Sequence, residues 1–299
     1  MTFSIVAFDE NTGDLGVAVQ SKFICVGAIV PWANVNVGAI ATQAMANMSY
    51  GSNGLDLLNS GLGAKEVLQK LINADEDKEH RQVAIIDTKG GVDAFTGKEC
   101  FEWAGHIVGD SYSVQGNILI SEETVESMAK AYETTKADLS DKLLASLSAG
   151  GAEGMGDRRG KQSASLLVVR EGGSYGGYTD RLVDIRVDEH VEPIKELQRI
   201  FNIYDMIFLT REDPENLLKI DGEVELNIKS VLTNLGYLKA SSKDKWGQSE
   251  NDALEAWFGI NNFENKWSPE SKIWKSVYDF LITEKGTPAI SLKKMSELF

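Results

Sequence analysis

The chain has 299 residues, of which 42% are hydrophobic and 25% charged, an ordinary composition for a globular protein. Its formal net charge of −15 argues against nucleic acid or an anionic membrane as the main partner, because both repel an acidic surface. Two cysteines, Cys25 and Cys100, cannot build a disulfide framework, and the N-terminus does not resemble a signal peptide. We therefore expect a cytoplasmic protein without a membrane span.

The first predicted element is a β-hairpin. Two apolar, β-rich runs cover residues 3–8 and 15–20, and the turn formers of residues 9–14 separate them. The first strand of this hairpin begins near Thr2, so its hydroxyl group and backbone nitrogen are expected to lie within the fold. A second strand of equal length returns beside the first and brings Lys22 close to Thr2.

Strands and helices then alternate in blocks. Apolar runs predict further strands at residues 24–31, 35–42, 82–87, 92–96, 165–170 and 182–187. Helical periodicity predicts helices at residues 50–59, 64–73, 121–134 and 139–149. This order indicates an α+β fold in which sheets and helix pairs form layers.

A helix from Pro193 to about Leu209 leads to a polar segment that contains Pro214, which we take as a boundary. We therefore expect one domain over residues 1–210 and a small helical domain over residues 211–299, with helices at 224–235 and 250–258. Four of the six tryptophans fall in this second part. They are interpreted either as core filling or as a stacking platform for sugar rings, since indole presents a broad apolar face.

Thr2 is a candidate nucleophile. A hydroxyl group needs a base, and a free α-amine on the same residue can serve, because its pKa lies near 8. Thr is small enough for removal of the initiator methionine, which exposes that amine. A cation at Lys22 would lower the pKa of a nearby ionisable group. The alternative for Lys22 is a solvated strand end.

Two glycine-containing segments are candidates for ligand contact. Residues 154–163 place Asp157, Arg158, Arg159, Gln162 and Ser163 among glycines just before a predicted strand, where Arg suits capture of a carboxylate or phosphate. Residues 113–117 place Gln115 and Asn117 before a predicted helix, where amides suit an oxyanion or a substrate amide. The alternatives are a solvated loop and ordinary turn residues. The three histidines lack metal-ligand spacing, so we expect neither a metal site nor a cofactor.

Several separate motifs resemble one family. These motifs are Thr2–Ala7, Val30–Ala33, Ala41–Ala44, Val114–Asn117 and Asp157–Ala164. In this order they are similar to the bacterial family known as domain of unknown function 1028, over residues 2 to about 190. The tail, through residues 235–237, 253–257 and 261–264, resembles the peptidoglycan-binding module often appended to that family.

The resemblance implies a fold and a site. The family is grouped with the N-terminal nucleophile (Ntn) hydrolases, so the implied fold is a four-layer αββα sandwich with a small C-terminal helical domain. The implied catalytic residues are Thr2, Lys22 and Asp157, and Gln20 stands where proteasome-type members carry an aspartate. The implied substrate contacts are Gln43, Gln115, Asn117, Arg158, Arg159, Gln162 and Ser163.

Two functions follow from these residues. The first is an Ntn-type amidohydrolase for a small amide or peptide-like substrate, such as a cell-wall fragment, in which Thr2 attacks the amide carbonyl. The second is a non-catalytic binding or scaffold protein that recognises cell-wall fragments or a protein partner through its tail. A homo-oligomer is compatible with either function.

Overall fold

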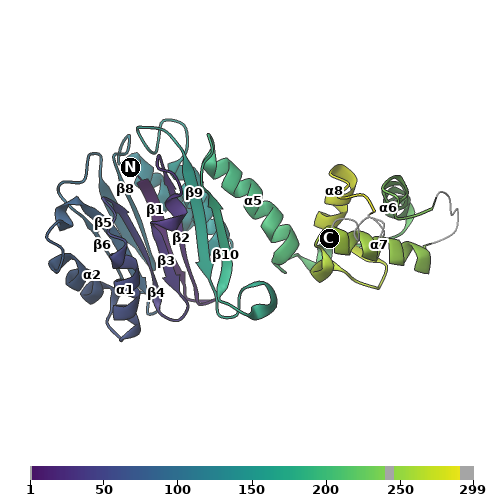
Figure 1. Cartoon of the computed structure of the whole chain (residues 1–299), viewed down its shortest axis with the longest axis horizontal. Coiled ribbons are helices and arrows are strands. Elements are labelled where there is room, and N and C mark those ends of the chain that lie inside the picture. The colour runs from purple at the N-terminus through teal and green to yellow at the C-terminus, as the bar shows by residue number, and fades with distance from the viewer. Residues whose placement is uncertain (1, 240–245, 290–299) are drawn as a thin grey trace, which may run out of the picture. The chain divides into compact units, whose positions relative to one another are not determined.

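The computed structural model describes residues 2–239 and 246–289 (Figure 1). It divides the chain into two compact units, residues 1–201 and residues 202–299. We describe each unit by itself. Within the described ranges, no helix combines the length and the apolar character needed to cross a membrane.

The first unit contains a six-stranded antiparallel sheet at whose centre the N-terminal hairpin lies. Its strands, in sheet order, are β10 (Arg181–Val187), β9 (Ser163–Val169), β2 (Asp14–Ser21), β1 (Thr2–Asp9), β8 (Tyr112–Asn117) and β7 (Gly105–Gly109). The predicted hairpin is confirmed, with Thr2 opposite Ser21 and Asp9 opposite Asp14. β1 is therefore paired on both sides from its first residue, which ties down Thr2.

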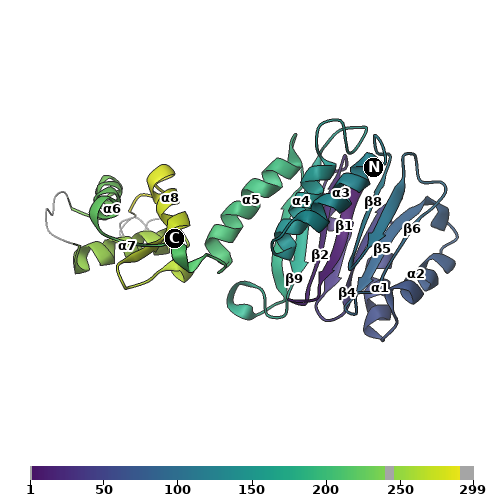
Figure 2. The ribbon, with the colours of Figure 1, turned by 180° about the vertical axis from the view of Figure 1, so that it is seen from behind.

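A four-stranded antiparallel sheet packs face to face against the first sheet. Its strands, in sheet order, are β3 (Pro31–Asn34), β4 (Gly38–Ala44), β5 (Arg81–Asp87) and β6 (Val92–Thr96). Helices α1 (Ser49–Asn59) and α2 (Ala64–Asn73) cover its outer face, as Figure 1 shows. Helices α3 (Glu123–Thr134) and α4 (Leu139–Gly150) cover the outer face of the larger sheet (Figure 2).

The space between the sheets is apolar over most of its length. Alternate residues of the central hairpin, including Val6, Val17 and Val19, pack there against Ala41 and Ile86 of the smaller sheet. Burial of this surface is the main favourable contribution to folding. The α+β class expected from the sequence is confirmed, because the helices accompany antiparallel sheets.

The strand predicted at residues 24–31 is wrong. This segment forms a short 3₁₀ turn, Val26–Ala28, and the strand β3 starts only at Pro31. Cys25 has a left-handed backbone, with φ of 55°, and a Cβ at Gly27 would meet the Cβ of Ser165 at 2.6 Å. The close approach of the backbone to β9 explains why an apolar run does not continue as a strand.

The alternative interpretation of residues 113–117 as ordinary turn residues is wrong, because they form strand β8 beside β1. Ser, Gln, Gly and Asn are poor strand formers on an apolar sheet. Here their inward-facing amides meet other amides across the sheets, which replaces the missing apolar contacts. β7, which pairs with β8, was not predicted at all.

The second unit has its own core. It contains α6 (Gly222–Asn234), α7 (Gln248–Ile260) and α8 (Lys275–Thr283), with a two-stranded sheet of β11 (Leu217–Lys219) and β12 (Lys272–Trp274). The helices expected at 224–235 and 250–258 are confirmed. Trp257 is fully buried and stacks on Phe263 at 5.6 Å between ring centroids. For Trp257 the core-filling interpretation is therefore correct.

Helix α5 (Pro193–Phe208) spans the division between the units. Its buried residues, which include Leu197 and Phe201, all precede residue 202, whereas Met206 packs on the core of the second unit. Lys266, which is buried, donates to the carbonyl of Leu209 and pairs with Glu212. The residues around the expected boundary at 210–211 are thus tied to the second unit.

We predict that residues 1–210, prepared without the tail, fold independently. The core between the sheets and the core beneath α1 and α2 are built from residues of the first unit. Circular dichroism and urea titration should give one cooperative transition with the midpoint that this unit shows in the full chain. Aggregation, or loss of the cooperative transition, would mean that the two cores are interdependent.

Candidate functional site

Four polar side chains form a row across the strand ends of the larger sheet. Thr2 lies opposite Asn117 of β8 on one side and opposite Ser21 of β2 on the other, and Ser21 lies opposite Ser163 of β9. Residues in register on neighbouring strands point to the same face. Asn117 donates to Gln82 in the smaller sheet, so this row faces the space between the sheets.

The Thr2 hydroxyl lies within hydrogen-bonding distance of another hydroxyl. Its Oγ1 is 3.1 Å from Oγ of Ser21, and Thr2 is only 6% exposed. Sequence reasoning did not include Ser21 in the site. The sequence does indicate Ser21, because a hairpin with equal strands around residues 9–14 places residue 21, not residue 20, opposite residue 2.

Gln20 faces the other way. It lies opposite Phe3, whose ring points toward Gly150 of α4, and it is fully buried. Neither polar atom of its amide has a hydrogen-bond partner among the described residues. The residue that stands in the aspartate position of proteasome-type sequences is thus directed away from Thr2.

Ser163 holds the loop that follows β2. Its Oγ accepts a hydrogen bond from the N–H of Val26 at 3.1 Å and donates to the carbonyl of Phe23. Ser163 is completely buried, and both its donor and an acceptor lone pair are in use. Its side chain therefore fixes the loop 22–26 rather than presenting a free hydroxyl.

Asp157 joins the glycine-containing loop to the end of β2. Its two carboxylate oxygens accept from the backbone N–H of Lys22 at 2.9 Å and of Arg159 at 2.8 Å. Lys22 directly follows Ser21, the register partner of Thr2. Burial raises the pKa of Asp157 above its ordinary value, and the two N–H donors oppose this shift.

The basic residues of the predicted site lie at the surface. Lys22 reaches the carbonyl of Lys161 with its ammonium group, at 3.4 Å. Arg158 donates to the carbonyl of Glu102, and Arg159 donates to the carbonyl of Lys22 at 3.2 Å. Gln162 is half-buried, and its N–H donates to the carbonyl of Ser21. The structure thus places Lys22, Arg159 and Gln162 at the end of β2, whereas Arg158 contacts the backbone at residues 102 and 118.

A chain of buried side-chain hydrogen bonds links the two sheets behind Thr2. Ser113 donates to Gln115 at 2.9 Å, Gln115 donates to Ser4 at 2.6 Å, and Ser4 donates to Gln43 at 2.7 Å. Gln43 and Asn117 both donate to Gln82, at 2.8 Å and 2.9 Å. We call Ser4, Gln43, Gln82, Ser113, Gln115 and Asn117 the amide network. Gln82 also donates to the carbonyl of Gly116 at 2.7 Å and to Thr96 at 2.9 Å.

The amide network changes the interpretation of three predicted substrate contacts. Gln43, Gln115 and Asn117 are each no more than 1% exposed, and all three use their amides within the network. We infer that they position β1 rather than contact a substrate. Ser4 and Gln82 were missed, since serine at an inward strand position and an isolated glutamine carry no recognisable motif.

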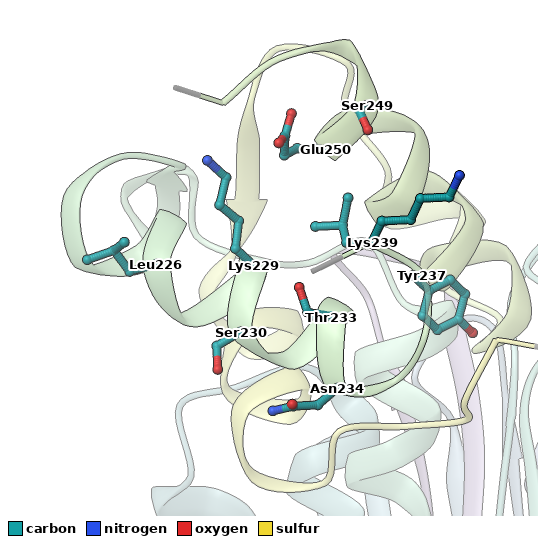
Figure 3. Close-up of a pocket in the computed structure, with 10 residues that line it drawn as sticks. Leu226, Lys229, Ser230, Thr233, Asn234, Tyr237, Lys239, Ser249 and Glu250 are labelled. Atoms are coloured by element: carbon teal, nitrogen blue, oxygen red, sulfur yellow. The ribbon is translucent and has the colours of Figure 1, made fainter. Parts of the chain in front are cut away.

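The second unit contains a pocket of about 690 Å³ between α6 and the start of α7 (Figure 3). Lys229, Thr233 and Tyr237 line one side, and Ser249 and Glu250 line the other. Lys229 pairs with Glu225 at 2.6 Å. The lining mixes hydroxyl, amide and charged groups, which suits a polar ligand.

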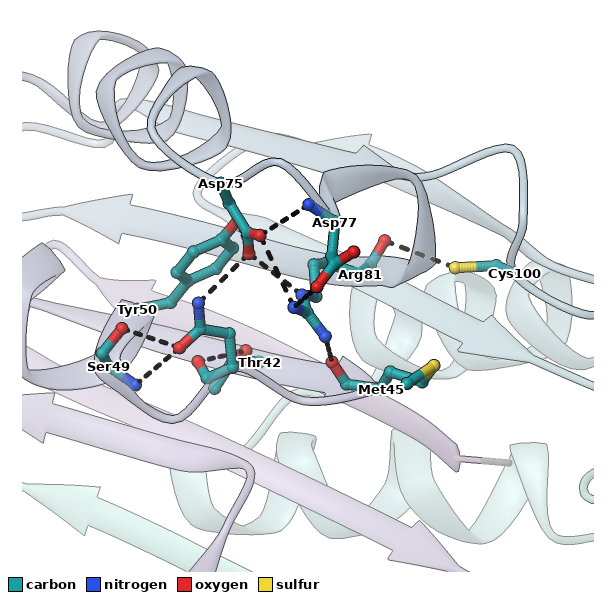
Figure 4. A network of polar contacts seen from close by, with 9 residues as sticks. Thr42, Met45, Ser49, Tyr50, Asp75, Asp77, Arg81 and Cys100 are labelled. Carbon is teal, nitrogen blue, oxygen red and sulfur yellow. Dashed lines mark hydrogen bonds and ion pairs between the residues drawn. The ribbon is translucent and has the colours of Figure 1, made fainter.

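A second polar cluster, centred on Asp75, ties four elements together (Figure 4). Asp75 accepts from Arg81 at 3.0 Å, from Tyr50 at 2.8 Å and from Asn47 at 3.1 Å, and Arg81 also donates to the carbonyl of Met45. The hydrogen bond from Arg81 holds the pKa of Asp75 well below its ordinary value. This cluster fixes the ends of β4 and α2 and the starts of α1 and β5.

Across the described ranges, no three histidine, cysteine or acidic side chains group closely enough to hold a metal ion. Burial raises the pKa of the Cys100 thiol, which keeps it protonated and weakly nucleophilic. The other free cysteine, Cys25, is half-buried in the loop that follows β2.

The fold and this strand-end site define an α/β protein with two facing antiparallel sheets. Residues 2–197 match the model described as "Family of unknown function (DUF1028)", which is more than half of the chain. The chain therefore belongs to the DUF1028 family. Residues 207–281 match a second model, described as "Putative peptidoglycan binding domain".

A solved structure supports the same assignment. The crystal structure of a DUF1028 protein from Silicibacter pomeroyi is 30% identical to this chain and has a TM-score of 0.62. The similarity covers 68% of this chain and 86% of that one. A search of curated proteins finds no match.

We predict that Gln43→Ala destabilises the protein by about 2–4 kcal/mol, because Ser4 and Gln82 lose buried partners and a cavity forms. Urea titration measures the free energy of unfolding. Gln69→Ala, an exposed glutamine of α2, is the matched control and should change stability by less than about 0.5 kcal/mol. Equal effects of the two substitutions would show that the amide network contributes little.

We predict that Asp75 makes the protein acid-sensitive. Because its folded pKa lies below its unfolded value, the ionised carboxylate stabilises the fold above about pH 4 and loses this effect as the pH falls. Asp75→Asn should cost about 2–4 kcal/mol at pH 7 and flatten the decline of stability between about pH 4 and 2. The exposed Gln69→Ala is the control here as well, since it changes no charge of this cluster. An unchanged profile for Asp75→Asn would contradict this assignment.

Proposed function

We propose that residues 2–197 form an Ntn-type amidohydrolase whose nucleophile is Thr2 once Met1 is removed. The observation that carries this proposal is the buried Thr2 hydroxyl, 3.1 Å from Ser21 Oγ and held at the end of a strand that is paired on both sides. Two facing sheets with helix pairs outside them agree with the layer order of Ntn hydrolases. The substrate would be a small amide or peptide-like molecule.

Apart from the substrate and one water molecule, the proposed reaction uses groups of this chain alone. The α-amine of Thr2 takes the proton from Oγ1, directly or through Ser21, as Oγ1 attacks the amide carbon. The C–N bond breaks, the leaving amine receives the proton, and an ester on Thr2 Oγ1 remains. Water, activated by the same α-amine, then cleaves the ester and releases the carboxylic acid. Water takes part only in this last step.

Other residues have supporting roles in this proposal. Asp157 holds the loop 157–160 against the end of β2 through Lys22 and Arg159, and the amide network fixes the other flank through Asn117. Lys22 and Arg158 lie at the surface, where they would attract an anionic substrate. The ammonium group of Lys22 contacts the loop carbonyl of Lys161, so Lys22 would act through its charge and not by touching Thr2.

A second candidate function rests on the tail. The peptidoglycan-binding-like domain at residues 207–281 and its polar pocket fit a cell-wall fragment as ligand. In this alternative the first unit is a scaffold, and Thr2 has no chemical role. The two functions are separated by the reactivity of Thr2.

We predict that the protein lacking Met1 is acylated at Thr2 by a β-lactone probe. Thr2→Ser, which keeps a hydroxyl, should retain labelling, and Thr2→Ala should lose it. Ser21→Ala should slow labelling about tenfold, since it removes the neighbouring hydroxyl. Peptide mass spectrometry locates the adduct.

Two controls make this labelling experiment decisive. Thr134→Ala changes an exposed threonine of α3 and should leave labelling unchanged. Protein that retains Met1 should not react, because an amide nitrogen is not basic. Equal labelling of wild type and Thr2→Ala, or none with any electrophile, would contradict the hydrolase proposal and favour the scaffold.

A further inference from the structure

The amide network continues beyond Gln82 to an edge strand of the larger sheet. Thr96 of β6 accepts from Gln82 at 2.9 Å, and its Oγ1 lies 2.9 Å from Nδ1 of His106 on β7. β6 and β7 are edge strands of the two different sheets, and they pack against each other. The contact between Thr96 and His106 therefore joins the two sheets at this edge.

The direction of these hydrogen bonds follows from the groups that can only accept. Nε2 of Gln82 also lies 2.7 Å from the carbonyl of Gly116 and 3.1 Å from the carbonyl of Gly105. Since carbonyl oxygens accept and never donate, this end of Gln82 carries the N–H groups, and Thr96 accepts from it as well. The hydroxyl proton of Thr96 is then available to donate to Nδ1 of His106.

An acceptor at Nδ1 specifies one form of the His106 ring. Neutral imidazole donates with one nitrogen and accepts with the other, whereas the protonated ring donates with both. Donation from Thr96 to Nδ1 therefore requires the neutral ring with its proton on Nε2. In the protonated ring Nδ1 would donate to Thr96, whose hydroxyl has no other acceptor among the described residues. Protonation of His106 thus leaves the half-buried Thr96 hydroxyl proton without a partner.

The same residues lead to the register partner of Thr2. Gln82 accepts from Asn117 at 2.9 Å, and Asn117 lies opposite Thr2. Three hydrogen bonds of 2.9 Å thus connect the ring of His106 with the residue beside the candidate nucleophile. Both ends of the Gln82 amide are in use, so a change at Thr96 alters the contacts of Gln82.

The surroundings of His106 favour its neutral form. Partial burial of the ring lowers the pKa of His106 below its ordinary value, and the carboxylate of Asp93 on β6 opposes this shift. β8 presents the uncharged Gln115 directly opposite His106. Helix α3, with Glu123 and Glu126 in its first turn, also packs against β7, but it lies on the outer face of the larger sheet. Protonation is therefore expected only below about pH 6.5.

We propose that neutral His106 is a positioning residue for Thr2, and that protonation of its ring weakens this positioning. The neutral ring accepts from Thr96, which accepts from Gln82, and Gln82 holds Asn117 beside the nucleophile. Protonation reverses the outermost of these hydrogen bonds. The proposal rests on the proposed function in one respect, because it concerns the reactivity of Thr2. That reactivity would fall in mildly acid solution more steeply than the titration of the α-amine alone predicts.

Long-range ¹H–¹⁵N NMR spectra of the full-length chain test the form of the His106 ring. At about pH 7.5, above the ordinary pKa of histidine, we expect a neutral ring with its proton on Nε2. The chain has three histidines, and loss of one signal in His106→Asn identifies the ring. A ring that carries its proton on Nδ1, or on both nitrogens, at this pH would overturn the proposal.

Substitutions separate the hydrogen bond of His106 from its shape. Asn places an amide near the position of Nδ1 and does not titrate, whereas Leu fills similar space without an acceptor. At about pH 7.5, His106→Leu should slow β-lactone labelling of Thr2 about fivefold or more, and His106→Asn should stay within about twofold of wild type. His80→Asn is the matched control, because His80 lies outside the amide network and its extension to His106. Equal rates for the Leu and Asn variants would contradict a role of the hydrogen bond.

The pH dependence of labelling tests the protonation step itself. The α-amine of Thr2 titrates in every variant, so its contribution cancels in the rate of wild type divided by the rate of His106→Asn. This ratio should be constant above about pH 7 and should fall about threefold or more between about pH 7 and pH 5. In a Thr96→Val background, which lacks the hydroxyl between His106 and Gln82, the same ratio should stay constant. A ratio that does not change with pH in the wild-type background would overturn the proposal.

A measurement without chemistry distinguishes this proposal from the hydrolase proposal. The side-chain amide signals of Gln82 and Asn117 should shift with the titration of His106 in wild type and stay fixed in His106→Asn. If they do so while no electrophile labels Thr2, the hydrolase proposal fails and the positioning by His106 stands. If Thr2 is labelled while these signals do not follow His106, only the positioning proposal fails.

Discussion

The candidate site depends on one constraint, which is that the primary amides buried between the two sheets must satisfy each other. A buried polar group without a partner costs about 1–3 kcal/mol. Gln43 and Gln82 from the smaller sheet meet Ser4 and Asn117 from the larger one, so the relative placement of the sheets is fixed at this end. Apolar side chains elsewhere between the sheets can repack, whereas these contacts have a fixed geometry.

The amide network fixes the position of Thr2. Its register partner Asn117 is a member, and Ser4 lies two residues along the same strand. The hydroxyl of Thr2 is therefore held to a site whose neighbours cannot shift without loss of buried hydrogen bonds. The proposed nucleophile needs this preorganisation, since chain ends are otherwise loose.

Elements that a single local pattern specifies were predicted correctly. The hairpin 2–21 and the amphipathic helices followed from alternation and from helical periodicity. Prediction failed where a residue acts through a partner far along the chain. The polar residues of β8 are explained by their contacts with Gln43 and Gln82. The turn at residues 26–28 is explained by the close approach of β9 to Gly27. Ser21 is an exception, because the local register of the hairpin already places it opposite Thr2.

The central claim is that Thr2 carries a free α-amine when the protein is active. Intact-mass and N-terminal peptide mass spectrometry of the protein, isolated from the cells that express it naturally, tests this most directly. Our account predicts that the first residue is Thr2, with an unmodified amine. Retention of Met1, or acylation of that amine, would contradict it.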